Sequence, residues 1–126
     1  MKKHSIGRVK DELKKLIINE SVTEEQAEAS MRILQNFNQC MIGLSHFSGT
    51  TPWECHEDDE FLQVLDGKVE VLVLNGTNKS NELLQSGDCF VVPKTLWHRQ
   101  MSSDGAKIMF ITSIEGNKMS MDEYPV

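Results

Sequence analysis

The chain has 126 residues, of which 39% are hydrophobic and 25% are charged, an ordinary composition for a single folded domain. Acidic residues outnumber basic ones by 19 to 13, so the formal net charge is −6. Because nucleic-acid binders usually carry a basic surplus, this balance argues against DNA or RNA as a partner.

The N-terminal 30 residues are predicted to form a helical segment. Charged residues follow the basic start, and no apolar run approaches the roughly 20 residues that cross a bilayer, so we expect a cytoplasmic protein with no membrane partner. Apolar side chains recur at helical spacing over residues 6–18. A second short helix is expected from Thr23, because Thr23 and Gln26 have the spacing of a capping box.

Residues 31–114 change to short apolar runs separated by turn residues, which is typical of an all-β sandwich, jelly roll or barrel. The predicted strands cover residues 31–36, 39–47, 53–56, 60–66, 68–74, 89–92, 97–101 and 107–114. Asp66-Gly67 lies between two alternating runs and predicts a tight hairpin. Five apolar positions are expected to line the interior: Leu62, Val64, Val69, Val71 and Val92. The polar tail, 115–126, is expected to be loosely ordered or to lie against the barrel or a neighbouring subunit.

Four residues of this β region are candidate metal ligands. Glu54 and His56 are two positions apart on a predicted strand, so their side chains share one face. Glu60 follows a short turn, and His98 lies far away in the sequence. Two neutral imidazoles and one or two carboxylates inside a barrel would suit a divalent cation. The three cysteines form no CxxC pair, and Cys55 is expected to face away from the cluster.

The spacing of these residues resembles the two sequence motifs of the cupin family. In the first motif, Glu54 and His56 are followed by three residues and Glu60, then by six residues and Gly67. The second motif is carried by Gly87, Pro93, Thr95 and His98. Four positions depart from the family pattern. Glu54 stands where the first motif histidine is expected, and Thr95 replaces a glycine. Ser102 stands where the second motif ends in Asn, and the initial glycine of the first motif is displaced, since four residues separate Gly49 from Glu54 where the motif expects five.

The stretch from Trp53 to Gly67, together with residues 90–93 and 97–99, looks like the small stand-alone cupins similar to mannose-6-phosphate isomerase. The resemblance implies a double-stranded β-helix, or jelly-roll barrel, over residues 31–114, preceded by one or two short helices. It also implies one divalent metal ion (Fe, Mn or Zn) held by His56, Glu60, His98 and Glu54, a small-molecule ligand or substrate, and a homodimer.

The ligand set leaves the chemistry open at this point. If Glu54 stays off the metal, the other three residues form a two-histidine, one-carboxylate set that suits Fe(II) and O2 chemistry. If Glu54 binds, a Lewis-acid role in isomerisation or proton transfer is more natural. Glu54 could instead be the catalytic base. We therefore expect a dioxygenase or an isomerase/cyclase acting on a small oxygenated molecule, with a non-catalytic, ligand-binding cupin as the alternative.

Overall fold

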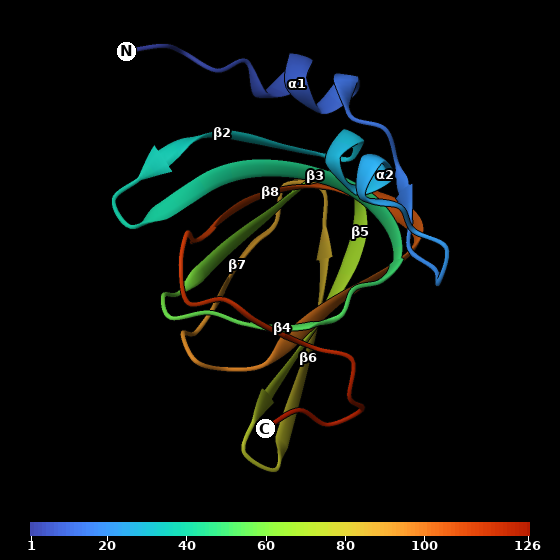
Figure 1. The fold of residues 1–126 in the computed structure, drawn as a ribbon, viewed down its shortest axis with the longest axis vertical. Coiled ribbons are helices and arrows are strands. Elements are labelled where there is room, and N and C mark those ends of the chain that lie inside the picture. Colours follow the sequence, from blue (N-terminus) through green and yellow to red (C-terminus); the bar gives the residue numbers. More distant parts are fainter.

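The computed structural model describes residues 1–126 and shows nine strands curled into one strongly bent sheet, with two short helices on one side (Figure 1). The helices are α1 (Ile6–Glu12) and α2 (Glu24–Ala29). The strands are β1 (Leu16–Ile17), β2 (Met31–Phe37), β3 (Cys40–Thr50), β4 (Trp53–Cys55), β5 (Glu60–Asn75), β6 (Asn78–Gln85), β7 (Cys89–Val92), β8 (His98–Ser113) and β9 (Lys118–Ser120). No helix has the length and apolar character to cross a membrane. The all-β fold class is confirmed.

Three long strands form the centre of the curled sheet. β8 pairs antiparallel with β3 on one side and with β5 on the other. β2 adds to β3, whereas β7 and β6 add to the two halves of β5. This arrangement encloses a concave inner face, and side chains that alternate along each strand project into it.

The predicted hairpin at Asp66-Gly67 is wrong, because β5 runs without a break from residue 60 to residue 75. Gly67 adopts a left-handed φ of +85°, and the pairing of β5 with β8 shifts register around it. A Cβ atom at this position would collide with the backbone carbonyl oxygen of Gly105 on β8. The glycine therefore forms a bulge where β5 and β8 approach closely. A bulge, like a tight turn, can require the positive φ that glycine adopts easily.

The first predicted helix is shorter than its apolar spacing indicates. α1 ends at Glu12, and the chain then extends so that Leu16 in β1 pairs in parallel with β3. Val9 and Leu13 pack on Leu44 at the outer face of β3, whereas Leu16 packs against the main core. The helix therefore ends early, because the apolar side chains before and after residue 14 pack against two different clusters. The second helix is confirmed, with its capping box formed.

The main core fills the concave face and consists of eleven buried apolar residues. All five positions predicted to line the interior belong to it, and none is more than 1% exposed. Phe47 and Phe110, from β3 and β8, complete one wall. Polar side chains replace the apolar ones at β4 and at the first residues of β5 and β8. The candidate ligands lie at that end.

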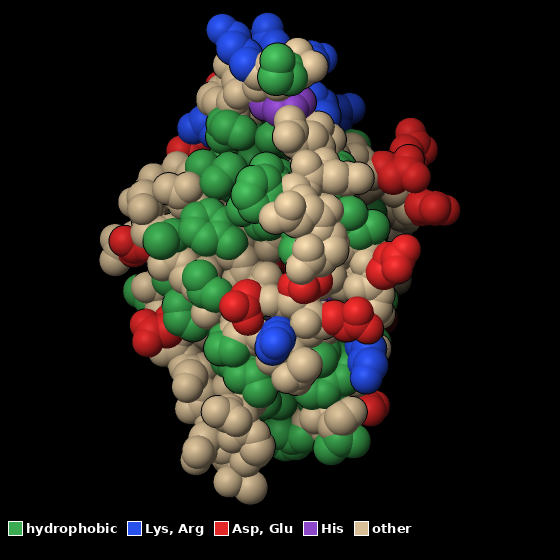
Figure 2. Space-filling model, turned by 90° about the vertical axis from the view of Figure 1, so that its left-hand side faces the viewer, with side chains coloured by type: hydrophobic (Ala, Val, Ile, Leu, Met, Phe, Trp, Pro, Cys, Tyr) green, Lys and Arg blue, Asp and Glu red, His purple; other side chains and the backbone are tan.

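The outer surface carries many large hydrophobic side chains. Figure 2 shows them gathered over one face, whereas Lys and Arg side chains cluster at the end of the molecule that bears the N-terminal segment. Edge strand β2 contributes Met31, Ile33 and Phe37, which are 44–54% exposed. The homodimer stays a prediction. The polar tail lies against the barrel, because β9 pairs antiparallel with β4.

Candidate metal centre

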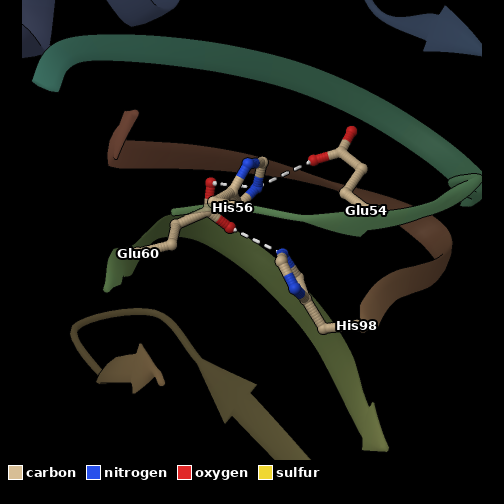
Figure 3. Close-up of side chains that lie close together, drawn as sticks. All are labelled: Glu54, His56, Glu60 and His98. Carbon is tan, nitrogen blue, oxygen red and sulfur yellow. Dashed lines mark hydrogen bonds and ion pairs between the residues drawn. The ribbon is translucent and has the colours of Figure 1, made fainter. Parts of the chain in front are cut away.

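Strand β4 and the first residues of β5 and β8 bring the four candidate ligands together (Figure 3). Glu54 lies on β4, and His56 follows this strand directly. Glu60 and His98 are the first residues of β5 and β8. Glu54 is the Cα partner of His98 in the β4–β8 pairing, so the two side chains share a face. The convergence therefore depends on strand pairing between segments about forty residues apart.

The side chains of these residues meet within a small space. Glu60 bridges the two imidazoles, with Oε1 3.0 Å from Nε2 of His98 and Oε2 3.4 Å from Nε2 of His56. Oε2 of Glu54 lies 3.4 Å from the same His56 nitrogen. One ligand atom from each residue falls within 4.8 Å of all the others. These distances suit four donors around one ion.

Burial distinguishes Glu54 from the other three residues. His56, Glu60 and His98 are 1–7% exposed, whereas the Glu54 side chain is 39% exposed. Charged and polar groups are rarely buried this deeply unless they are paired or bind a metal. Glu54 lies at the wetter side of the cluster, where it could bind an ion or exchange a proton with a ligand. Its role as ligand or base stays a prediction.

Both imidazoles use Nδ1 to hold their orientation. Nδ1 of His56 donates to the Oδ1 atom of Asn117 at 2.7 Å, and the Asn117 amide group in turn donates to the Ser113 carbonyl oxygen. Nδ1 of His98 lies 3.2 Å from the Leu96 carbonyl oxygen. Such contacts fix a tautomer and leave Nε2 free for a metal. Sequence reasoning missed Asn117, because no local signal links it to His56.

The electrostatics of His56 favour a positive charge at its inner nitrogen. Burial lowers the pKa of His56, but the adjacent Glu54 carboxylate, the charge of Glu60 and the contact with Asn117 outweigh that effect and raise the pKa to about 8. Nε2 of His56 is also buried without a hydrogen-bond partner. A proton or a divalent cation would satisfy this nitrogen and the carboxylates beside it. The residues present therefore fit a metal ion.

The backbone around His56 is held by a residue of the second motif. The Thr95 N–H group donates to the His56 carbonyl oxygen at 2.8 Å. Thr95 adopts a φ of +66°, the left-handed conformation that the motif glycine would adopt easily. The replacement therefore preserves the loop shape at a cost in backbone strain.

The remaining residues singled out from the sequence lie outside the cluster. Cys55 is 9% exposed and pairs with Lys118 of β9, on the opposite side of β4 from Glu54. Trp53 is 2% exposed, and the guanidinium group of Arg99 stacks 4.5 Å from its ring centre. Strand alternation puts these side chains on the opposite side of β4 and β8 from Glu54 and His98, and Trp53, Arg99 and Lys118 also help to line a neighbouring cavity. They do not contribute donors to the candidate centre.

A large cavity of about 990 Å³ opens beside the cluster. Glu54, His56 and Glu60 form part of its wall. Phe47 and Phe110 belong to its apolar part. The candidate centre is thus accessible to a small organic molecule, and most of the remaining surface of the cavity would contact apolar groups.

Residues 46–114 match the family model described as "Cupin domain", or Cupin_2, over more than half of the chain. The chain belongs to the cupin family. The resemblance seen in the two motifs is thus confirmed, and the cluster matches a cupin site in which Glu54 replaces a motif histidine. No curated protein matches this cupin in sequence.

Several solved structures share the fold of this cupin. A cupin-2 domain protein from Shewanella frigidimarina is 29% identical, with a TM-score of 0.58 over 67% of this cupin and 79% of that chain. Hydroquinone 1,2-dioxygenase from Sphingomonas, with 4-hydroxybenzoate bound, is 20% identical, with a TM-score of 0.60 over 69% of this cupin and 66% of that chain. Oxalate oxidase in complex with glycolate is 21% identical, with a TM-score of 0.57 over 70% of this cupin and 53% of that chain. At 20% and 21% identity, the latter two structures show that the fold is shared and nothing further.

Proposed function

We propose that this cupin is a metal-dependent enzyme that acts on a small oxygenated molecule, with a divalent ion held by His56, Glu60, His98 and Glu54. The observation that carries the proposal is the convergence of two imidazole Nε2 atoms and two carboxylates beside an accessible cavity. When bound, a divalent ion supplies Lewis-acid polarisation and, if it is iron, O2 activation.

The residues of the cluster would have different roles, with the histidines as oriented ligands and Glu54 as a proton acceptor. His56 and His98 present Nε2 in fixed tautomers, because their Nδ1 atoms are held from behind. Glu54 is the one acid of the cluster with substantial exposure, so it can accept a proton from a bound molecule at its carboxylate oxygen. The apolar part of the cavity, which includes Phe47 and Phe110, would contact the body of that molecule.

Two reaction classes fit this arrangement. A dioxygenase agrees with the three deeply buried donors and with the fold shared with hydroquinone 1,2-dioxygenase. An isomerase or cyclase agrees with the exposed position of Glu54, which suits a base. Oxygen uptake during turnover separates the two classes, since isomerisation and cyclisation consume no O2.

The test begins with metal binding by untagged protein. We expect about one equivalent of Fe(II) or Mn(II) per chain, and a double variant with His56→Ala and His98→Ala should retain none. The matched control is His4→Ala, because His4 contacts Gln35 far from the cluster. Wild-type protein that retains no metal, and recovers none on titration, would contradict the proposal.

A non-catalytic role as a small-ligand-binding cupin is the second candidate. The replacement of the motif histidine by Glu54 favours it, since an altered ligand set can bind without turnover. A screen of oxygenated substrates with the metal-loaded protein discriminates the two functions. Consumption of any of these substrates would contradict a purely binding role.

A further inference from the structure

Five buried side-chain polar atoms in this chain have no hydrogen-bond partner, and all five belong to residues that line the cavity beside the metal centre. They are Trp53 Nε1, His56 Nε2, Arg99 Nε, Gln100 Oε1 and Thr112 Oγ1. Folded proteins pair nearly all of their buried polar atoms, so these five need an explanation. The metal ion would satisfy His56 Nε2, and strand alternation puts Trp53 and Arg99 on the opposite face from His98. Gln100 Oε1 and Thr112 Oγ1 are the two that remain on the inner face. A bound molecule with polar groups would supply the missing partners.

Gln100 is one of these residues, and it shares the inner face with the candidate ligand His98. His98 and Gln100 pair with Val73 and Val71 of β5, so both side chains project to the same side as the buried valines. Gln100 therefore lies directly beyond His98 along β8. Its Oε1 atom can accept a hydrogen bond but cannot donate one.

Thr112 approaches the cluster from the opposite end of β8. It follows Ile111, the Cα partner of Phe61, and so lies beside Glu60 on the neighbouring strand. Thr112 is 6% exposed, and its Oγ1 atom lacks a partner. A hydroxyl group can both donate and accept, so Thr112 and Gln100 together suit a ligand that itself carries a hydroxyl group.

The positive side chains of the lining occupy the other face of the sheet. Arg99 alternates with His98 and Gln100 and stacks on Trp53. Lys118 pairs with Cys55, opposite Glu54. The inner face thus offers two carboxylates, Glu54 and Glu60, whose charges would balance one divalent ion. A carboxylate ligand would therefore give the loaded centre a net negative charge. Arg99 and Lys118, the basic residues of the cavity lining, are placed on the other face by strand alternation.

The opposite wall of the cavity is apolar. Phe47, Ile108 and Phe110 project inward from β3 and β8 and line the cavity. Phe110 also lies close to Gly43, where a Cβ atom would displace its ring, so the cavity wall at that point depends on a missing side chain. This surface suits a ring or a short hydrocarbon body rather than a fully polar molecule.

We propose that the cavity selects a neutral, hydroxyl-bearing organic molecule with an apolar body, whose hydroxyl group is hydrogen-bonded by Gln100 and Thr112 beside the metal centre. The inference rests on the proposed metal-dependent function and names its substrate class. Selection against anions follows from the second carboxylate. With a neutral histidine at position 54, the divalent ion and Glu60 would leave a net positive charge, whereas the Glu54 carboxylate neutralises it.

The experiment compares two probes of similar size, 4-hydroxybenzyl alcohol and 4-hydroxybenzoate, by calorimetry on the Mn(II)-loaded protein. We expect the alcohol to bind at least about tenfold more tightly than the carboxylate. Thr112→Val and Gln100→Leu should each weaken alcohol binding about three- to tenfold and leave Mn(II) affinity unchanged. Thr112→Ser keeps the hydroxyl group and should retain binding. Thr77→Val, at the exposed β5–β6 turn, is the matched control.

A charge-changing variant tests the selection directly. Glu54→Gln should reduce the preference for the alcohol, because it removes one negative charge from the inner face. Tighter binding of the carboxylate by the wild type, or unchanged alcohol binding in both Thr112→Val and Gln100→Leu, would overturn the inference while the metal function stands. Wild-type protein without bound Mn(II) would overturn the proposed function and this inference together.

Discussion

The Oδ1 atom of Asn117 lies 2.7 Å from Nδ1 of His56, although 61 residues separate the two in the chain. The contact is directional, because the Asn117 amide group also donates to the Ser113 carbonyl oxygen and cannot easily flip. Nδ1 of His56 must therefore be the donor, and Nε2 faces the carboxylates. A residue of the C-terminal segment thus sets which nitrogen of a candidate ligand is free.

Replacing Asn117 by alanine should weaken metal binding about 10- to 100-fold, the range found when such supporting contacts are lost. Asn117→Asp keeps an acceptor oxygen and should retain most of the affinity. Metal titration measures the effect. The nitrogen chemical shifts of His56 report its tautomer in the metal-free protein at a pH well above its pKa of about 8, where the imidazole is neutral. Asn78→Ala, at the exposed end of the β5–β6 hairpin, is the control. An unchanged tautomer in Asn117→Ala would contradict the positioning role.

Metal affinity should depend on pH through His56, whose pKa is raised to about 8 in the metal-free protein. A metal at Nε2 must displace the proton, so apparent affinity should fall about tenfold per pH unit below pH 8 and level off above it. The stability linkage of the metal-free protein has the opposite sign. Because the folded pKa exceeds the unfolded value, the contribution of His56 is complete below pH 6.5 and is lost as pH rises through about 8.

Titrations with Mn(II) at pH 6.5, 7.5 and 8.5 measure this dependence. The His56→Gln variant keeps a polar side chain but has no titrating nitrogen, and its affinity should depend less steeply on pH. Equal slopes for the variant and the wild type would show that another group controls the pH dependence.

Thr95 is held at a φ of +66°, which is unfavourable for a β-branched residue. Asparagine tolerates this conformation, so Thr95→Asn should raise the free energy of unfolding by about 0.5–1 kcal/mol. Urea denaturation measures the change, with Thr77→Asn as a control at a turn residue without positive φ. Metal affinity should be unaffected, because the contact with the His56 carbonyl oxygen uses the backbone N–H group. A destabilised Thr95→Asn variant would show that its own side-chain contacts outweigh the strain.

Gly67→Ala should lower the free energy of unfolding by about 3 kcal/mol, because a left-handed φ and a backbone collision with Gly105 both penalise a Cβ atom. Gly7→Ala in α1 is the matched control, since no neighbouring atom lies within 4 Å of the place that its Cβ atom would take. That control should be neutral or stabilising by about 0.5–1 kcal/mol. Equal effects of the two substitutions in thermal or urea unfolding would contradict the role of the bulge.

The spacing of residues on one short segment predicts most of the candidate centre. His56 and Glu60 lie at motif positions, and strand alternation correctly places Glu54 on the same face as His56. The predicted hairpin at Gly67 is wrong for a physical reason. A glycine with positive φ occurs in turns and in bulges, so its presence does not distinguish the two. Here the close approach of the Gly105 backbone on β8, from a distant part of the sequence, favours the bulge.

Asn117 and β9 could not be predicted from local pattern. A strand of three residues, Lys118–Ser120, is too short for its pattern of polar and apolar side chains to indicate a strand. β9 forms because its backbone pairs with the edge of β4. The positions of Gln100 and Thr112 follow from the register of β8 against its neighbours, which shifts once along β3 and twice along β5. These features are properties of the assembled sheet rather than of any segment.

The pairing of β9 with β4 also orders events during synthesis. At about 5–20 residues per second, Asn117 leaves the ribosome roughly 3 to 12 seconds after His56, since 61 residues separate them. During that interval the nascent chain carries Glu54, His56 and Glu60 without the contact that fixes the imidazole. The imidazole of His56 is therefore held in place only after the C-terminal segment has paired with β4, so the proposed ion would meet the fully oriented ligand set only in the folded chain.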